Sequence, residues 1–123
     1  MKKRLKSFSF ALKGIKSAFS TEPNMKIHGI IALLVVIFGI LFQISINEWL
    51  LCLLCFGLVF GLELINTSLE NIVDLVSPEI HPTAGKIKDL AAGAVLISAL
   101  FSAVIGLIIF IPKIWEWLSR LTN

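Results

Sequence analysis

The sequence predicts an all-α integral membrane protein, in which an N-terminal amphipathic interfacial helix precedes three transmembrane helices. Apolar residues make up 57% of the 123 residues and charged residues only 15%, against about 25% charged residues in an ordinary soluble domain. Three long apolar segments follow one another along the chain, and seven of its eleven lysines and arginines stand before residue 27. The length fits one domain, residues 1–123.

Residues 1–21 are predicted to form the interfacial helix. Apolar side chains recur there every three or four residues and make one stripe, while lysines dominate much of the remainder: Leu5, Phe8, Leu12, Ile15 and Phe19 form the stripe. A basic amphipathic helix of this kind lies in the plane of the membrane interface. Beside long apolar segments, the basic charge indicates contact with anionic lipid headgroups and not with nucleic acid. A signal peptide is excluded because the first apolar run begins only near residue 27 and no small-residue cleavage site follows it.

The three transmembrane helices are predicted at about residues 27–46, 49–74 and 90–112. The first and third segments reach the roughly 20 apolar residues that a membrane span requires. The second is free of charge only over residues 49–62, but its helical pattern continues through Asp74. Its last turns therefore carry acids, and Glu63 is expected near the inner boundary of the hydrocarbon. The residues Ser20 to Pro23 are expected to separate the interfacial helix from the first span, because proline disfavours helix at the preceding residue.

The distribution of basic residues predicts the topology through the positive-inside rule. The strongly basic N-terminus is expected to stay in the cytoplasm. The loop at residues 45–48 contains no Lys or Arg and is expected outside, and the loop at residues 75–89, with two lysines, is expected inside. The C-terminus then lies outside. Tryptophan rings suit membrane interfaces, and all three are expected at the outer one: Trp49, Trp115 and Trp117.

Four polar residues form one stripe at the end of the second span. Glu63, Asn66, Glu70 and Asp74 are spaced three, four and four residues apart, which places them on one helix face. A solvated helix end is the simpler interpretation, but the stripe starts inside an apolar segment. Its first members therefore need partners or a water-filled cavity, which favours a functional site.

Further charged residues are expected at the same membrane boundary, namely Glu22 before the first span and Lys88 and Asp89 before the third. Carboxylates that converge with lysines resemble a site for a magnesium–nucleotide complex, because Mg²⁺ takes one or two carboxylates plus substrate phosphates. Phosphoryl transfer requires such charge neutralisation more than covalent chemistry. The phosphate-binding loop of soluble nucleotide hydrolases is absent. The charge and spacing of these residues therefore support an acidic site at the membrane boundary, but they do not identify its ligand.

Residues 63–74, Glu-Leu-Ile-Asn-Thr-Ser-Leu-Glu-Asn-Ile-Val-Asp, resemble the signature of the prokaryotic diacylglycerol kinase family. The resemblance extends from about Phe8 to Pro112, and includes Lys13-Gly14, Glu22, Lys88-Asp89 and the small residues 91–94. His81-Pro82 and residues 88–95 look most like the Gram-positive branch, whose members phosphorylate undecaprenol. His28 stands where the diacylglycerol branch typically carries an acid, and this departure argues against diacylglycerol.

This resemblance implies a homotrimer with active sites shared between subunits, which uses ATP and Mg²⁺ to phosphorylate a lipid alcohol. The first expectation is undecaprenol, converted to undecaprenyl phosphate, and the alternative is diacylglycerol, converted to phosphatidic acid. Glu63 is the implied general base, and Glu22 and Glu70 are the implied metal ligands. The implied nucleotide contacts are Lys3, Phe10, Glu22, Glu70, Glu79, Ile80, His81, Lys88 and Asp89. The implied supporting or substrate contacts are Asn66, Asp74, Lys13 and Trp49.

A non-enzymatic interpretation also stands, namely a small helical membrane subunit or an ion-binding transporter. A transporter places its charges near the middle of the bilayer, whereas the acids here gather at one boundary. The expected location is the bacterial cytoplasmic (inner) membrane, with the N-terminus and the active site at the cytoplasmic face. Gly57 and Gly61 are expected to form a close-packing face between helices.

Overall fold

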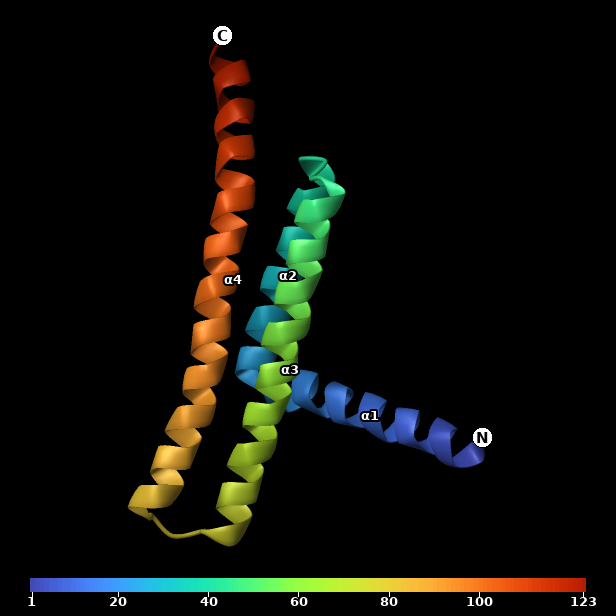
Figure 1. Cartoon of the computed structure of the whole chain (residues 1–123), viewed down its shortest axis with the longest axis vertical. Coiled ribbons are helices and arrows are strands. Elements are labelled where there is room, and N and C mark those ends of the chain that lie inside the picture. Colours follow the sequence, from blue (N-terminus) through green and yellow to red (C-terminus); the bar gives the residue numbers. More distant parts are fainter.

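The computed structural model describes all residues 1–123 and confirms the all-helical prediction. Its four helices are α1 (Lys2–Thr21), α2 (Pro23–Leu41), α3 (Ile46–Val76) and α4 (Pro82–Thr122). The last three are each long and apolar enough to cross a membrane, and they run side by side in Figure 1. Only 12 of the 123 residues are buried within the chain, so most of the apolar surface requires lipid or another protein around it.

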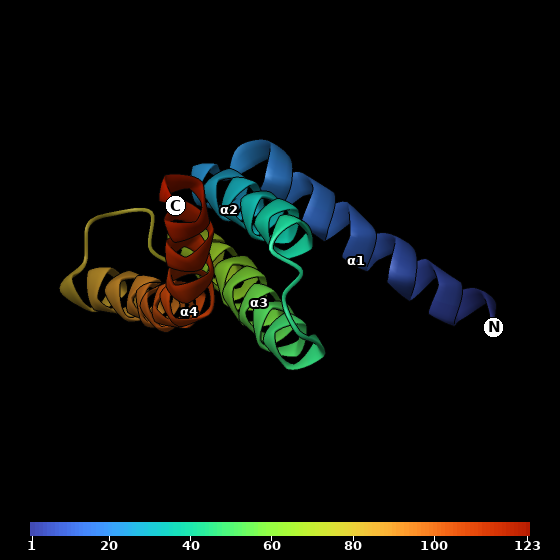
Figure 2. The same ribbon diagram turned by 90° about the horizontal axis from the view of Figure 1, so that it is seen from above.

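The boundary between α1 and α2 lies at Glu22, where the sequence predicts a break. Glu22 is extended (φ −97°, ψ 115°) and is both the C-cap of α1 and the N-cap of α2. Pro23 follows at the first position of α2, where its missing N–H breaks no helical hydrogen bond. Phe19 holds the end of α1 against the bundle, with its ring centroid 5.7 Å from that of Phe60. The rest of α1 projects away from α2, α3 and α4 (Figure 2).

The connection between α2 and α3 lies at residues 42–45, not at residues 45–48 as expected. Helix α2 ends at Leu41, before the expected end of the first span at residue 46, and Gln43 turns the chain with a left-handed φ of 50°. The Ser45 hydroxyl then accepts a hydrogen bond from the backbone N–H of Glu48 at 3.2 Å. This cap begins α3 at Ile46, before the expected start at residue 49.

A small hydrophobic core lies at this end of the bundle. Ile44, Cys52 and Ile109 are buried there, and Trp49 packs against them. The approach of Trp49 to α2 requires glycine at residue 39, because a Cβ atom on Gly39 would lie 2.6 Å from the indole ring. Cys52 is thus a small core residue, and neither cysteine forms a disulfide.

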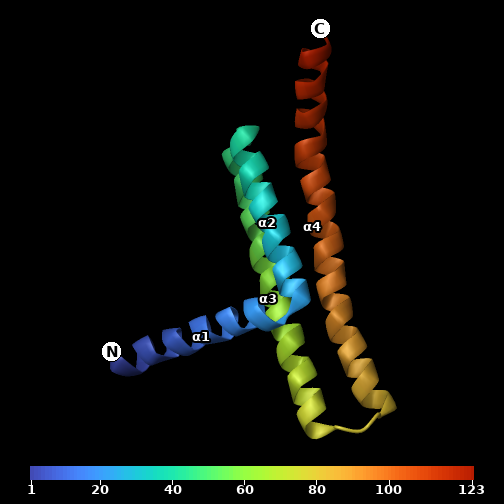
Figure 3. The ribbon, with the colours of Figure 1, turned by 180° about the vertical axis from the view of Figure 1, so that it is seen from behind.

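The connection between α3 and α4 is much shorter than the loop expected at residues 75–89. It occupies residues 77–81, and α4 begins at Pro82 with the ring Nδ1 of His81 accepting from the N–H of Thr83 at 3.1 Å. Helix α4 is the main packing partner of α3 and continues through Pro112 to Thr122. Figure 3 shows the connection at one end of the bundle and the C-terminus at the other.

Candidate functional site

Glu63 is a buried carboxylate on α3 that faces the start of α2. It is 2% exposed, and its Oε2 atom lies 3.8 Å from Nε2 of His28. Asn24, one turn before His28, is also close to this carboxylate. Oε2 nevertheless has no hydrogen-bond partner. Since an unpaired buried acceptor is destabilising by about 1–3 kcal/mol or more, the geometry leaves a place for a donor, a proton or a cation.

Asn66 and Glu70 continue the polar stripe along α3. Asn66 is 6% exposed, and its Nδ2 donates a hydrogen bond to Oε1 of Glu70 at 3.3 Å. The Oδ1 atom of Asn66 is buried without a partner, as is Oε2 of Glu63. The stripe thus presents two unpaired oxygen acceptors beside a half-buried carboxylate, on the one helix face that the spacing of these residues predicts.

Asp74 and Lys88 join the end of α3 to the start of α4. The Nζ atom of Lys88 donates to Oδ1 of Asp74, and both side chains are partly exposed. Asp89, the next residue, is exposed. The fold therefore places the Lys88 ammonium group of α4 at the end of the polar stripe of α3.

Glu22 approaches Glu63 from the junction of α1 and α2. It is half-buried, and the Thr21 hydroxyl donates to its Oε1 at 3.2 Å. The charges of Glu22 and Glu70 both lie near enough to interact with that of Glu63. The carboxylates of Glu22 and Glu70 therefore lie close enough to that of Glu63 to influence its charge.

The acids of this site do not form a metal-binding cage within the chain. No three His, Cys, Asp or Glu side chains of this chain gather closely enough to hold a metal by themselves. Mg²⁺ does not require such a cage, because it keeps several waters and takes one or two carboxylates plus substrate phosphates. The unpaired oxygens of Glu63 and Asn66 show that the site has acceptors free for an incoming group.

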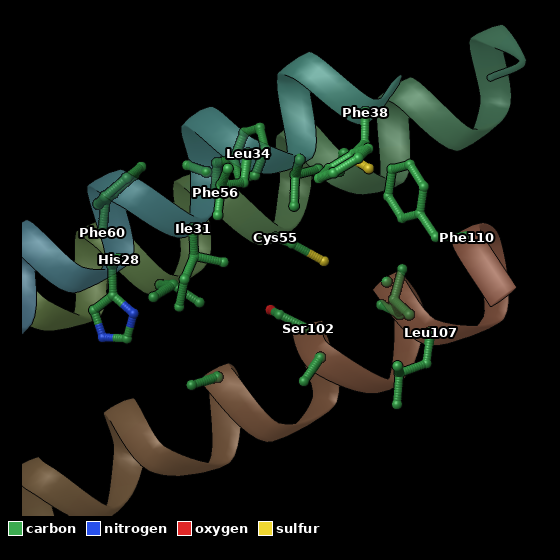
Figure 4. A pocket seen from close by; sticks show the side chains of 18 of the residues that line it. His28, Ile31, Leu34, Phe38, Cys55, Phe56, Phe60, Ser102, Leu107 and Phe110 are labelled. Atoms are coloured by element: carbon green, nitrogen blue, oxygen red, sulfur yellow. The ribbon is translucent and has the colours of Figure 1, made fainter. Parts of the chain in front are cut away.

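An apolar groove of about 440 Å³ runs between α2, α3 and α4, and we call it the lipid-facing groove. Sixteen of its 19 lining residues are hydrophobic. Figure 4 shows the His28 ring at one end of the groove and Phe110 toward the other. Small residues of α4, such as Ala99, Ala103 and Gly106, line it. The groove can therefore accommodate a hydrocarbon chain, and its polar end lies beside Glu63.

The residues on α1 do not join the acids of their own chain. Lys3, Phe10 and Lys13 are all exposed, and Lys13 Nζ lies 5.6 Å from the centre of the Phe10 ring. Lys3 precedes Glu22 by 19 residues, which is roughly 28 Å along a helix that projects away from the bundle (Figure 1). Lys3 therefore lies far from the acids of its own chain.

Glu79, Ile80 and His81 lie in the exposed connection between α3 and α4. The His81 ring is engaged there in capping α4. Trp49, by contrast, lies at the other end of α3, 14 residues or roughly 21 Å from Glu63. The structure brings Trp49 together with Gly39 and the hydrophobic core and not with the acidic stripe.

Asn24 and His28 are the neighbours of Glu63 that sequence reasoning missed. Taken alone, His28 is typical of an interfacial polar residue without a ligand role. The available signal is the four-residue spacing of Asn24 and His28 at the start of an otherwise apolar segment, which places both on one helix face. That face packs toward α3.

Together, these features define a helical membrane protein in which an acidic site meets the end of an apolar groove. A profile for the prokaryotic diacylglycerol kinases matches residues 9–110. The undecaprenol kinase of Bacillus subtilis (strain 168) is 46% identical over 109 residues, which cover 89% of each chain. The diacylglycerol kinase of Helicobacter pylori (strain J99) is 37% identical over 85% of this chain and 81% of its own length. The diacylglycerol kinase of Escherichia coli (strain K12) is 26% identical over 81% of this chain and 82% of its own length. The chain belongs to the prokaryotic diacylglycerol kinase family and is a lipid kinase.

Proposed function

We propose that this lipid kinase transfers the γ-phosphate of ATP, with Mg²⁺, to undecaprenol and so makes undecaprenyl phosphate. The observation that carries the proposal is the buried Glu63, whose unpaired oxygen lies beside the polar end of the lipid-facing groove. The higher identity to the undecaprenol kinase than to the diacylglycerol kinases supports the polyprenol. Diacylglycerol is the second candidate, because several relatives of this chain act on it by name.

In the proposed reaction, Glu63 acts as the general base. Its carboxylate takes the proton from the lipid hydroxyl, and the hydroxyl oxygen forms a bond to the γ-phosphorus. The bond between the γ-phosphorus and the bridging oxygen breaks, and ADP leaves with that oxygen. A base at the end of an apolar groove can reach an alcohol whose hydrocarbon chain stays within the membrane.

Glu22 and Glu70 are proposed to hold the metal, and Lys88, Asp89 and the connection at residues 79–81 to contact the nucleotide. When bound, Mg²⁺ neutralises phosphate charge and orients the γ-phosphate. Asn66 supports this arrangement because it donates to Glu70. Asp74 supports it because it holds the side chain of Lys88.

The proposed location is the bacterial cytoplasmic membrane, with the N-terminus and the site on the cytoplasmic side. The basic helix α1 leaves the bundle at a steep angle (Figure 3), which suits a helix that lies in the membrane interface. The proposed assembly is a homotrimer with shared sites. One observation supports it: Lys3, Phe10 and Lys13 on α1 lie far from the acids of their own chain. Gly57 and Gly61 do not form the expected close-packing face within the chain, because a Cβ atom added to either would meet no other atom within 4 Å.

A lipid panel tests the proposed substrate. The purified protein is incubated with ATP labelled at its γ-phosphate in micelles that contain either undecaprenol or a diacylglycerol at equal mole fraction, and label in the lipid extract is counted. We expect faster transfer to the polyprenol and none in lipid-free micelles. Faster transfer to diacylglycerol would assign the second candidate, and no transfer to either lipid would overturn the proposed reaction.

A further inference from the structure

His28 is the residue that connects the lipid-facing groove to the buried carboxylate. Its ring forms one end of the groove (Figure 4), and its Nε2 atom lies 3.8 Å from Oε2 of Glu63. The side chain is 18% exposed. A lipid alcohol whose chain fills the groove would therefore bring its hydroxyl past the imidazole before it reaches Glu63.

We propose that His28 is a positioning residue for Glu63. The Nε2–H group donates to Oε2 when the lipid hydroxyl arrives, and this bond holds the carboxylate in one orientation toward that hydroxyl. The inference rests on the proposed function of Glu63 as the base. It assigns to His28 neither a proton transfer nor a bond to the metal.

The unpaired oxygen of Glu63 is the physical reason for this role. Oε2 is buried and has no hydrogen-bond partner, so nothing holds the carboxylate in one orientation through this oxygen. A hydrogen bond from His28 to Oε2 would stop the carboxylate from rotating. The present separation of 3.8 Å exceeds the 2.7–3.2 Å of an N–H···O bond. Catalytic hydrogen bonds are often long before the substrate binds and tighten in the complex, and a shift of roughly 1 Å closes this one.

A passive wall of the groove is the competing role for His28, and kinetics separate the two. A wall residue changes the KM for the lipid, because it contributes only to binding. A residue that orients the base changes kcat and leaves the KM for ATP and for the lipid almost unaltered. A side chain that restores the N–H donor should also restore the rate in the second case only.

The test compares wild type, His28→Leu and His28→Gln, with Glu63→Gln as the inactive reference. We expect kcat of His28→Leu to fall about 10- to 100-fold, the range for a lost hydrogen bond to a charged group, while both KM values stay within about 3-fold. His28→Gln should recover most of the rate because its amide N–H can reach the carboxylate. Lys113→Met is the matched control, since it removes a 3.2 Å contact to the Glu48 carboxylate at the other end of the bundle, and it should keep the wild-type kcat.

Several results would overturn the role of His28. These are an unchanged kcat in His28→Leu, a change confined to the lipid KM, equal losses in the Leu and Gln variants, or an equal loss in Lys113→Met. Oligomer size and melting temperature are measured for each variant, so that His28→Gln decides the question if His28→Leu does not fold. Failure of the underlying function shows differently, because wild type would then label no lipid or Glu63→Gln would remain active.

Discussion

Glu63 and Glu70 lie two turns apart on α3, yet their surroundings differ. Glu63 is buried between α3 and the start of α2 beside an apolar groove, and one of its oxygens is unpaired. Glu70 is half-buried and accepts a hydrogen bond from Asn66. Two carboxylates in different environments can take different roles, so we assign the base to Glu63 and a metal contact to Glu70.

Replacing Glu70 by alanine should raise the Mg²⁺ concentration needed for half-maximal activity. The change removes one proposed ligand. Since the loss of even an outer-shell group that orients a ligand typically lowers metal affinity about 10- to 100-fold, we expect a shift at least that large. Activity is measured against Mg²⁺ at fixed ATP. Glu116→Ala removes an exposed acid that pairs only with Arg120 on the far end of α4 and should titrate like wild type. A Glu70→Ala curve that overlays the wild-type curve would refute the assignment.

The polar stripe is predictable from sequence, whereas its partners are not. The spacing of Glu63, Asn66 and Glu70 places them on one face by helix geometry alone, and the hydrogen bond between Asn66 and Glu70 follows from their four-residue spacing. The approach of His28 to Glu63 depends on how α2 packs against α3. No local pattern encodes that packing.

At the scale of the helices, hydropathy locates the membrane segments but not the helix ends. Helix α4 begins at Pro82 and runs to Thr122, well beyond the charge-free residues 90–112 that predict the third span. Apolar character marks where lipid surrounds the chain, while backbone hydrogen bonds continue through any residue compatible with a helix. The caps at Ser45 and His81 mark the true starts of α3 and α4.

Gly39 should be required for the packing of α2 against α3. A Cβ atom there would meet the Trp49 ring at 2.6 Å, and such overpacking usually destabilises by about 1–3 kcal/mol. Gly39→Ala is therefore expected to lower the melting temperature in detergent, followed by circular dichroism. Gly106→Ala is the matched control, since no atom lies within 4 Å of its added Cβ. Equal melting temperatures for the two variants would contradict this packing.

At the scale of the whole molecule, we propose that one chain needs neighbouring chains to complete its site. Most of its apolar side chains are exposed, and α1, which carries Lys3 and Phe10, projects away from the other three helices (Figure 1). The family resemblance implies shared sites, and the projection of α1 gives a geometric reason for sharing. The sequence alone does not show this reason, because the angle between α1 and the bundle depends on the packing of Phe19 on Phe60 and Gly29.

Mixed trimers test whether α1 serves a neighbouring subunit. One chain carries Glu63→Gln and the other carries Lys3→Ala with Phe10→Ala, so that each is inactive or weak by itself. If the α1 of one chain completes the site of the next, random co-assembly should restore about a quarter of the sites. Activity of the co-expressed mixture is compared with that of the two variants mixed after separate purification. If α1 serves its own chain, no mixture regains activity.

The central claim is that Glu63 takes the proton from a lipid hydroxyl during phosphoryl transfer. The most direct measurement compares wild type and Glu63→Gln for transfer of labelled γ-phosphate into extracted lipid, with oligomer size checked by native mass spectrometry. Glutamine keeps the size of the side chain but cannot act as the base, so we expect at least a roughly 10²-fold loss of turnover, within the range for general-base catalysis, in an assembly of unchanged size. Turnover by Glu63→Gln close to that of wild type would contradict the mechanism.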